Sequence, residues 1–301
     1  MKYDIIVLGS GPAGLSAAVT ARGRNKSVLV IGNRWQDSPL ARAERVDNYL
    51  GMPGMTGMEM LEAFQRHAQE MGVEQVTGKV LSIMEWEGFN LTVGSQLYQG
   101  SALILAPGVV RQAKFPGEET YLGRGVSYCA TCDGAFFRGK DVAIVGGGNT
   151  ALEDALYLAN VCRTVYLVHR RDAFRGEKAL ADRVRQKENI KIQYDSAVSK
   201  IRGESAVSSV LLENTKTGAQ QELPVSAVFV AIGLIPENEI FSRQLPLDDN
   251  GYFVAGEDCK TPLEGVFVAG DCRSKLLRQI ITAAADGAVA GYQAAAYVNG
   301  I

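Results

Sequence analysis

The chain has 301 residues, of which 47% are hydrophobic and 21% charged, a composition typical of a globular protein with room for two domains. Its formal net charge of −2 argues against a nucleic-acid partner and against attraction to an anionic membrane surface. Five cysteines with one close pair do not form the dense pattern of a secreted disulfide scaffold, so we expect a soluble cytoplasmic protein.

The first fifty residues follow the order strand, glycine turn, helix, strand. The apolar run Tyr3–Leu8 is typical of a buried parallel strand, and it lacks the basic segment and cleavage site of a signal peptide. Gly9, Gly11 and Gly14 follow in GxGxxG spacing, ahead of an Ala-rich helix over residues 15–24. Glycines here permit a tight turn, close approach to a pyrophosphate and close helix–strand packing, while the helix N-terminus offers free amides. This pattern predicts a dinucleotide site.

The loop after the second strand departs from the usual dinucleotide site. The acid that normally holds a ribose is replaced by Gly32 and Asn33. Trp35 follows in the same loop, and two interpretations stay open for it: ordinary packing, or stacking on a cofactor. The pyrophosphate site is unaffected by these changes.

The middle of the chain predicts an inserted domain. Residues 74–99 alternate in polarity and predict an antiparallel excursion. Residues 106–119 and 231–242 contain proline and glycine and predict the connections between two domains. We place the joints near residues 113 and 243, so that 1–113 and 243–301 form one discontinuous domain and 114–242 form a second.

Cys129 and Cys132 form a CxxC pair at the start of the inserted segment. Such a pair can bind a metal, close a structural loop, or carry two electrons as a reversible dithiol. Zinc sites normally use four Cys or His ligands, whereas this chain has only two histidines and its other cysteines are isolated. So short a disulfide loop would constrain the unfolded chain little. Redox chemistry is the favoured interpretation, with Asp133 as a neighbouring proton donor or acceptor.

A second strand–turn–helix unit follows the cysteines. The strand over residues 140–145 leads into GGGNTA, with a helix over 152–160 and a strand over 164–168. Where an NAD site would carry an acid, the chain has His169 followed by a group of arginines: Arg170, Arg171 and Arg175. Guanidinium groups bind a 2′-phosphate, so NADPH is favoured over NADH. The alternative is a basic turn that faces solvent.

A third nucleotide-related segment lies near the C-terminus. A strand within residues 264–272 ends at Asp271, whose carboxylate suits the hydroxyls of a polyol. The helix that begins near Gln279 aims its positive end at the same place. Asp286 within it argues for a buried core helix over a membrane span, which needs about 20 nearly uncharged residues. Together with the first glycine turn, this segment predicts one divided site.

Five motifs together resemble the low-molecular-weight, bacterial-type thioredoxin reductases over essentially the whole chain. They are GxGxxG at 9–14, CATCD at 129–133, GGGNTA at 146–151, HRRDxFR at 169–175, and AGD followed by RQ within 269–279. The resemblance implies an α/β fold of two Rossmann-like, three-layer ββα dinucleotide-binding domains, with the NADPH domain inserted into the FAD domain, and a homodimer. It also implies rotation of one domain relative to the other.

The resemblance further implies an electron path from NADPH through FAD to the disulfide and on to thioredoxin, without a metal. Cys132 would face the flavin, Cys129 would attack the thioredoxin disulfide, and Asp133 would act as the acid. The FAD-binding residues implied are Gly9, Gly11, Pro12, Ala13, Gly14, Asn48, Gly108, Gly270, Asp271, Arg278, Gln279 and Ile280. The NADPH-binding residues implied are Gly146, Gly148, Asn149, Thr150, His169, Arg170, Arg171 and Arg175. Residues 34–40 and 106–108 depart from the family's usual FAD contacts.

Three other functions fit the same predicted fold. A dithiol oxidase would pass electrons from CxxC through FAD to oxygen, and a related reductase would take electrons from ferredoxin. The arginine cluster argues against both, since neither needs NADPH. A nucleotide-sensing protein with slow turnover is the third alternative, and the CxxC pair between two nucleotide motifs argues against it.

Overall fold

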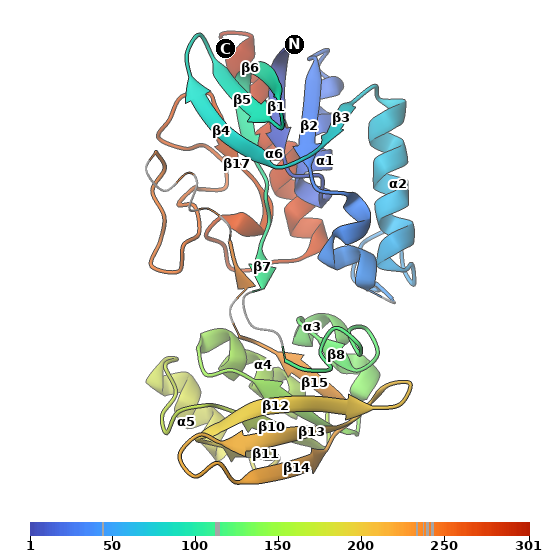
Figure 1. Ribbon diagram of the computed structural model, residues 1–301, viewed down its shortest axis with the longest axis vertical. Helices are drawn as coiled ribbons and strands as arrows, with labels where there is room; N and C mark the ends of the chain where they lie inside the picture. Colours follow the sequence, from blue (N-terminus) through green and yellow to red (C-terminus); the bar gives the residue numbers. More distant parts are fainter. Residues whose placement is uncertain (44, 112–114, 233, 237, 239–240, 242–243) are drawn as a thin grey trace. The chain divides into compact units, whose positions relative to one another are not determined.

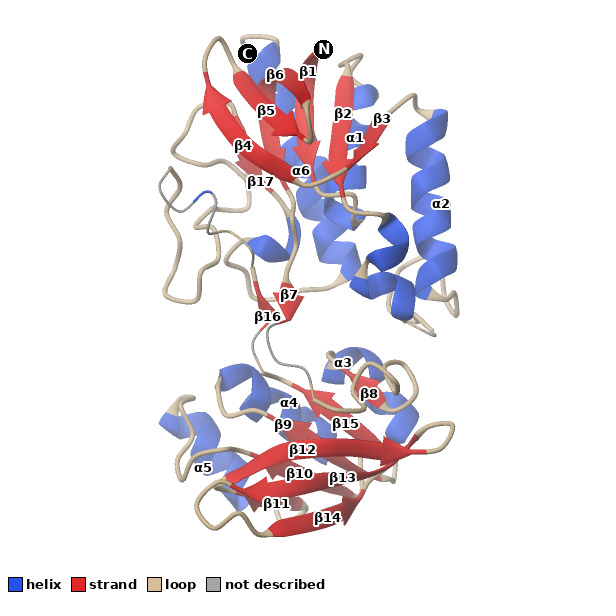
Figure 2. Cartoon of the chain, in the orientation of Figure 1, coloured by secondary structure: helices blue, strands red, loops and turns tan. Residues whose placement is uncertain are grey.

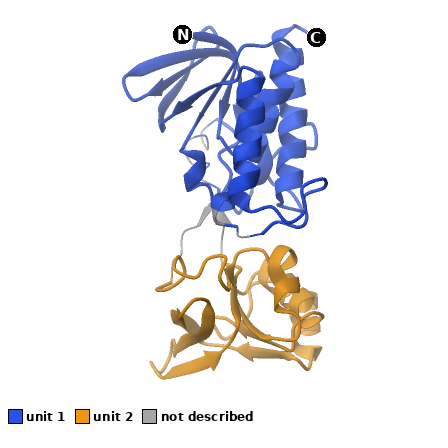
Figure 3. Cartoon of the chain, turned by 90° about the vertical axis from the view of Figure 1, so that its right-hand side faces the viewer, with its two compact units in different colours: residues 1–110, 235–301 blue, residues 111–234 orange. Residues whose placement is uncertain are grey.

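The computed structural model describes residues 1–43, 45–111, 115–232, 234–236, 238, 241 and 244–301. The chain divides into two compact units, residues 1–110 with 235–301 and residues 111–234, coloured separately in Figure 3. The domain joints expected near residues 113 and 243 lie outside the described residues. Short strands β7 (Val110–Arg111) and β16 (Leu234–Ile235) pair where the chain passes between units.

Unit 1 is built on a mixed sheet with the strand order β3-β2-β1-β6-β5-β4, and β17 also pairs with β6 (Figure 1). The pairs β1–β2, β2–β3, β1–β6 and β6–β17 are parallel, whereas β4, β5 and β6 form an antiparallel meander. The bounds are β1 (Lys2–Leu8), β2 (Val28–Gly32), β3 (Glu74–Thr77), β4 (Val80–Glu85), β5 (Phe89–Val93), β6 (Gln96–Leu105) and β17 (Val266–Val268).

The prediction that residues 74–99 form an antiparallel excursion is partly wrong. Its later part is antiparallel, but β3 pairs in parallel with β2. Helix α2 (Gly57–Glu70) precedes β3 and makes the connection that a parallel strand needs. The segment from β2 to β3 is therefore a strand–helix–strand unit of the main sheet.

Alternate residues of β1 face two separate cores. Ile5 and Val7 pack with the helices, and Ile6 and Leu8 pack with the layer on the other face. The helical layer includes α1 (Pro12–Arg22) and α6 (Ile280–Val298). A Cβ atom on Gly287 would lie 2.1 Å from the Ala13 carbonyl oxygen, so only glycine permits this approach of the two helices. In the described part of the chain, no helix is long and apolar enough to span a bilayer.

Unit 2 repeats this plan with a parallel sheet, β11-β10-β9-β15-β8, and a separate antiparallel sheet, β12-β13-β14 (Figure 2). Val142 and Ile144 of β9 pack toward the helices, and Ala143 and Val145 pack toward the antiparallel sheet. The expected α/β fold with three-layer units is thus confirmed. The strands are β8 (Val126–Ser127), β9 (Asp141–Val145), β10 (Thr164–Val168), β11 (Ile190–Gln193), β12 (Ser196–Gly203), β13 (Val207–Asn214), β14 (Gln220–Pro224) and β15 (Ala227–Val230).

The helices of unit 2 are α3 (Ala130–Asp133), α4 (Asn149–Ala159) and α5 (Lys178–Gln186), with a 3-10 turn, η3 (Gly134–Phe137), after α3. Both nucleotide-type helices begin three residues earlier than expected. Helix α1 starts at Pro12 because proline is favoured in the first turn, where its missing N–H is not needed. Helix α4 starts at Asn149, directly after the extended residue Gly148. The glycine turns therefore lead directly into the helix N-termini.

Candidate active site

The residues expected to hold a flavin nucleotide converge on one edge of the unit 1 sheet. Leu8 at the end of β1 aligns with Leu105 of β6, and Val268 of β17 aligns with the same residue. Because the carboxyl ends of parallel strands meet at one edge, the turns after β1, β6 and β17 lie side by side. These turns contain Gly9, Gly108 and Gly270.

The first glycine turn combines close packing with open space. Gly9 has φ +120°, and a Cβ atom there would lie 2.0 Å from the Ala106 carbonyl oxygen. A Cβ atom on Gly14 would lie 1.8 Å from the Gly9 carbonyl oxygen. By contrast, Gly11 and Gly108 have no atom within 4 Å of a Cβ position. Gly11 is the N-cap of α1 and offers no side chain to cap the helix. The backbone N–H groups of the first turn next to Pro12 therefore suit a pyrophosphate.

Asp271 supplies an unsatisfied buried acceptor at the same edge. Its Oδ1 atom is buried and has no hydrogen-bond partner among the described residues. Burial raises the pKa of Asp271 to about 6, against the opposing effect of Lys275 and Arg278. The Arg278 Nε atom donates to the Asp271 carbonyl oxygen at 3.2 Å. A buried oxygen of this kind fits the hydroxyl group of a bound flavin nucleotide, so this edge suits FAD.

The remaining expected flavin contacts are less uniform. Ala13 packs against Gly270, where a Cβ atom would lie 2.7 Å from the Ala13 Cβ. Gln279 precedes α6 and its N–H donates to Thr282 Oγ1 at 3.0 Å, and Ile280 is the first residue of the helix. Asn48 lies exposed in a loop.

A cavity of about 300 Å³ also opens at this edge of the sheet. Trp35 lines it, as do residues from β3, a segment whose sequence indicates no chemistry. The lining residues are Ser10, Val30, Gly32, Asn33, Arg34, Trp35, Gln36, Gln75, Val76 and Thr77. The signal that was missed is topological: β3 joins the parallel sheet beside β2, so its end reaches the same edge.

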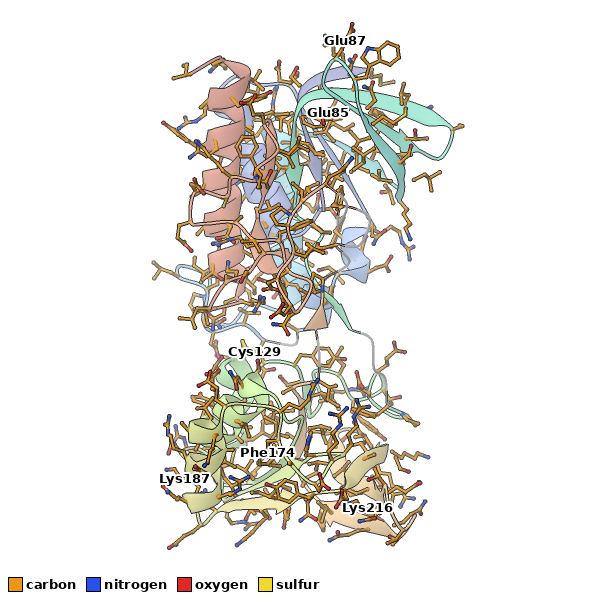
Figure 4. All side chains as sticks on the ribbon, turned by 90° about the vertical axis from the view of Figure 1, so that its left-hand side faces the viewer. Glu85, Glu87, Cys129, Phe174, Lys187 and Lys216 are labelled. Atoms are coloured by element: carbon orange, nitrogen blue, oxygen red, sulfur yellow. A yellow bond between two sulfur atoms is a disulfide. The ribbon has the colours of Figure 1, made fainter. Side chains whose placement is uncertain are left out.

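Cys129 and Cys132 form a disulfide in unit 2, with their Cα atoms 5.2 Å apart; Cys129 is labelled in Figure 4. Cys129 caps α3, and the Cys132 backbone N–H donates to its Sγ atom at 3.2 Å. In the reduced state the same amide would stabilise a thiolate on Cys129. This geometry makes Cys129 suitable as the nucleophile, as the family resemblance implies.

Asp133 lies at the end of the same short helix. Its Oδ2 atom accepts a hydrogen bond from Ser127 Oγ at 2.6 Å, and Ser127 is itself buried. Burial raises the pKa of Asp133, and the Ser127 hydrogen bond partly offsets this. A carboxyl with a raised pKa keeps its proton to a higher pH, which suits a residue that protonates a departing thiolate.

We expect Asp133→Asn to slow reoxidation of the reduced cysteine pair by an external disulfide about 100-fold, since the acid is lost. Stopped-flow rates across pH provide the measurement. In the unchanged protein the rate should fall as pH rises through the Asp133 pKa, and the asparagine variant should lack this dependence. Ser127→Ala is the matched control: it removes a hydrogen bond that lowers the Asp133 pKa, so the transition should move to higher pH. Identical profiles in all three proteins would contradict a role for Asp133.

The second glycine turn, after β9, forms a similar edge in unit 2. Val145 at the end of β9 aligns with Val168 of β10 and Val230 of β15. A Cβ atom on Gly146 would lie 2.6 Å from the Ala151 Cβ, whereas Gly148 has open space. Next to these glycines, the Asn149 side chain accepts from the Glu177 N–H at 2.7 Å, and Thr150 is exposed.

The three arginines form a free cationic group beside this turn. Arg170, Arg171 and Arg175 are exposed, and in the stretches that the structure describes their guanidinium groups have no hydrogen bond or ion pair. His169 differs, because it is only 5% exposed and its Nε2 atom is 2.9 Å from the Ala173 carbonyl oxygen. Burial lowers the pKa of His169, so the ring is neutral and donates this bond. His169 thus anchors the loop, while the arginines are available to an anion.

Comparison with known proteins shows the family to which this chain is similar. The sequence profile of the pyridine nucleotide-disulphide oxidoreductase family matches residues 3–287. The thioredoxin reductase of Treponema pallidum is 40% identical over 99% of this chain and 97% of its own length. That of Vibrio cholerae is 42% identical over 98% of this chain and 96% of its own length. The crystal structure of thioredoxin reductase from Streptococcus pyogenes is 36% identical, with a TM-score of 0.94 over 100% of this chain and 99% of that one.

Proposed function

This chain belongs to the pyridine nucleotide-disulphide oxidoreductase family, among the thioredoxin reductases, and from that premise we propose that it transfers electrons from NADPH through FAD to the Cys129–Cys132 disulfide and on to a thioredoxin. The observation that carries the proposal is the disulfide itself, whose Cys129 sulfur already accepts an amide hydrogen bond. We assign FAD to residues 1–113 with 243–301, and NADPH to residues 114–242.

The residues on the flavin side divide the work of binding. The glycine turn after β1 would hold the pyrophosphate at the N-terminus of α1. The unpartnered oxygen of Asp271 would accept a hydrogen bond from a hydroxyl of the nucleotide. When bound, FAD supplies the ability to take a hydride and pass its two electrons to a disulfide.

Opening of the Cys129–Cys132 bond takes up two electrons and one proton, which leaves a Cys129 thiolate and a Cys132 thiol. The Cys129 thiolate then attacks a thioredoxin disulfide, and one thioredoxin sulfur leaves. Cys132 closes the bond again by attacking the resulting mixed disulfide, and thioredoxin departs as a dithiol. Asp133 gives its proton to the first thioredoxin sulfur that leaves, takes up the Cys132 proton and passes it to the second, and then regains a proton from solvent. The proposal includes a cytoplasmic homodimer. Its support is a group of exposed apolar side chains at and before α6, which a second copy of the chain could cover; they include Leu276, Leu277 and Tyr292.

The electron donor is tested by the combined variant Arg170→Ala/Arg171→Ala. The unchanged protein, purified with its flavin, should be bleached rapidly by NADPH in the absence of oxygen, and more slowly by NADH. In the variant we expect the KM for NADPH to rise at least about tenfold, because each lost charge-assisted contact to a phosphate costs about 1.5–3 kcal/mol before allowance for solvent exposure. The KM for NADH should change little.

Lys178→Ala serves as the matched control, since it removes an exposed positive charge from α5 in the same unit. Unchanged selectivity in the arginine variant would refute this NADPH site. A flavin that NADPH does not bleach would favour the dithiol oxidase or a ferredoxin-supplied reductase instead.

A further inference from the structure

We propose that Lys216, in the turn between β13 and β14, is a positioning residue for recognition of the cofactor's 2′-phosphate. Its charge, which it shares between Asp195 and Asp172, offsets part of the negative charge of Asp172 within the arginine segment and ties that segment to the β13–β14 turn. The inference rests on the proposed function, because it concerns the same NADPH site. Lys216 acts through Asp172 and does not itself need to touch the cofactor.

Three chain segments meet at Asp195, which lies between β11 and β12 with φ +49°. Its N–H donates to the Arg171 carbonyl oxygen at 3.1 Å, and its carbonyl oxygen accepts from the Thr215 N–H at 2.6 Å. Thr215 Oγ1 also lies 3.2 Å from the Arg170 carbonyl oxygen. The backbone of both arginines is therefore held by residues outside their own segment.

Lys216 adds charge pairing to this backbone framework. Its Nζ atom lies 3.3 Å from Asp172 Oδ2 and 3.0 Å from Asp195 Oδ1. The Asn214 side chain fixes the turn, because its Oδ1 accepts from the Lys216 N–H at 3.0 Å and the Thr217 N–H at 2.9 Å. Figure 4 labels Lys216 and Phe174 in this unit. The lysine thus leaves a rigid turn and reaches both carboxylates.

Asp172 is the one acid within the run from Arg170 to Arg175, and its side chain is 76% exposed. An unpaired carboxylate there would repel a phosphate dianion bound by the neighbouring guanidinium groups. Charges within about 8–10 Å interact appreciably at physiological salt. By pairing with Asp172, Lys216 preserves the positive field of the arginines.

An aromatic stack keeps the arginine segment in place independently of Lys216. The Phe174 ring centroid lies 5.4 Å from that of His169 and 5.0 Å from that of Tyr194. The Arg185 guanidinium lies over the same phenyl ring at 6.0 Å. Loss of Lys216 should therefore change the charge near the phosphate without unfolding the segment.

The test measures NADP⁺ and NAD⁺ dissociation constants by calorimetry on the flavin-loaded protein carrying Lys216→Met, Lys216→Arg, Asp172→Asn, or Lys216→Met with Asp172→Asn. We expect Lys216→Met to weaken NADP⁺ binding about three- to fivefold, as befits an exposed pair, and to leave NAD⁺ binding unchanged. Lys216→Arg should restore NADP⁺ binding. In the Asp172→Asn background, Lys216→Met should have a clearly smaller effect, and the difference should shrink at high salt.

If Lys216→Met weakens the binding of NADP⁺ and NAD⁺ equally, Lys216 has only a structural role. If it leaves NADP⁺ binding unchanged, Lys216 has no role in cofactor binding. Either result overturns the inference. The proposed NADPH site fails separately, if Arg170→Ala/Arg171→Ala leaves NADP⁺ binding intact. The arginine variant therefore distinguishes a wrong cofactor site from a wrong positioning residue.

Discussion

Serine at either Cys129 or Cys132 is expected to lower NADPH-dependent reduction of thioredoxin at least about a thousandfold, because a single sulfur cannot store two electrons as a reversible disulfide. Bleaching of the flavin by NADPH should persist in both variants, since the nucleotide sites are untouched. The measurement pairs steady-state turnover with anaerobic absorbance of the flavin. Loss of turnover with retained bleaching places the defect at sulfur.

The two serine variants should also differ from each other. In Cys132→Ser the remaining Cys129 thiol keeps the role of nucleophile and should trap thioredoxin as a stable mixed disulfide, visible by mass spectrometry. Cys129→Ser should trap little. Cys162→Ala is the matched control, because Cys162 is a free, buried cysteine of the same unit and should leave turnover unchanged. A doubly substituted Cys129→Ser/Cys132→Ser protein with full turnover would contradict the proposed electron path.

The parts of the site that could be predicted from sequence are those fixed by short-range backbone requirements. Gly9 and Gly14 are needed because another residue's Cβ atom would meet a carbonyl oxygen within 2.0 Å, and such a requirement leaves a spaced pattern in the sequence. The Cys129–Cys132 pair is equally local, since one short helix brings the two sulfurs together. Motifs of this kind identify the edge of a sheet before the sheet is known.

Contacts between distant segments could not be predicted in the same way. Lys216 lies 44 residues from Asp172, and nothing in the composition of either segment indicates that they pair. The β3 contribution to the cavity depends on strand order, which alternation alone does not give. In the sequence, Asp286 indicates only that its helix is a poor membrane span, because its buried partners depend on how the loop before α6 folds back.

Asp286 holds a buried charge cluster in unit 1. Asp286 is 6% exposed and Arg273 is 2% exposed. The guanidinium donates to both carboxylate oxygens, at 2.8 and 2.9 Å, and Lys275 Nζ lies 2.7 Å from Oδ2. The Gly270 N–H donates to the same oxygen at 3.0 Å, directly before Asp271. Asp286 therefore pairs with two buried cations, of which Arg273 also pairs with exposed Glu257 at 3.2 Å, and it fixes the loop that carries the flavin-side acid.

Burial alone would raise the pKa of Asp286, but hydrogen bonds from Arg273 and Lys275 outweigh it and hold the pKa below its usual value. A carboxyl whose pKa is lower in the folded chain stabilises the fold fully above its unfolded pKa of about 3.9. This stabilisation is lost as pH falls through the lower folded value. Asparagine at this position cannot be ionised, so that part of the acid dependence of stability should disappear.

Asp286→Asn is accordingly expected to lower the free energy of unfolding of unit 1 by about 3–5 kcal/mol at neutral pH, because it removes the carboxylate that pairs with buried Lys275 and leaves Arg273 only its ion pair with exposed Glu257. Urea unfolding followed by tryptophan fluorescence isolates this unit, since both tryptophans, Trp35 and Trp86, lie within it.

Asp141→Asn is the matched control, because it breaks the ion pair with Arg163, whose side chain is 69% exposed. It should lower the free energy of unfolding of unit 2, followed by hydrogen exchange, by less than about 1 kcal/mol. If Asp286→Asn costs no more than Asp141→Asn, the buried cluster does not stabilise the fold. If stability falls as predicted while flavin retention does not, the cluster supports the fold without positioning Asp271.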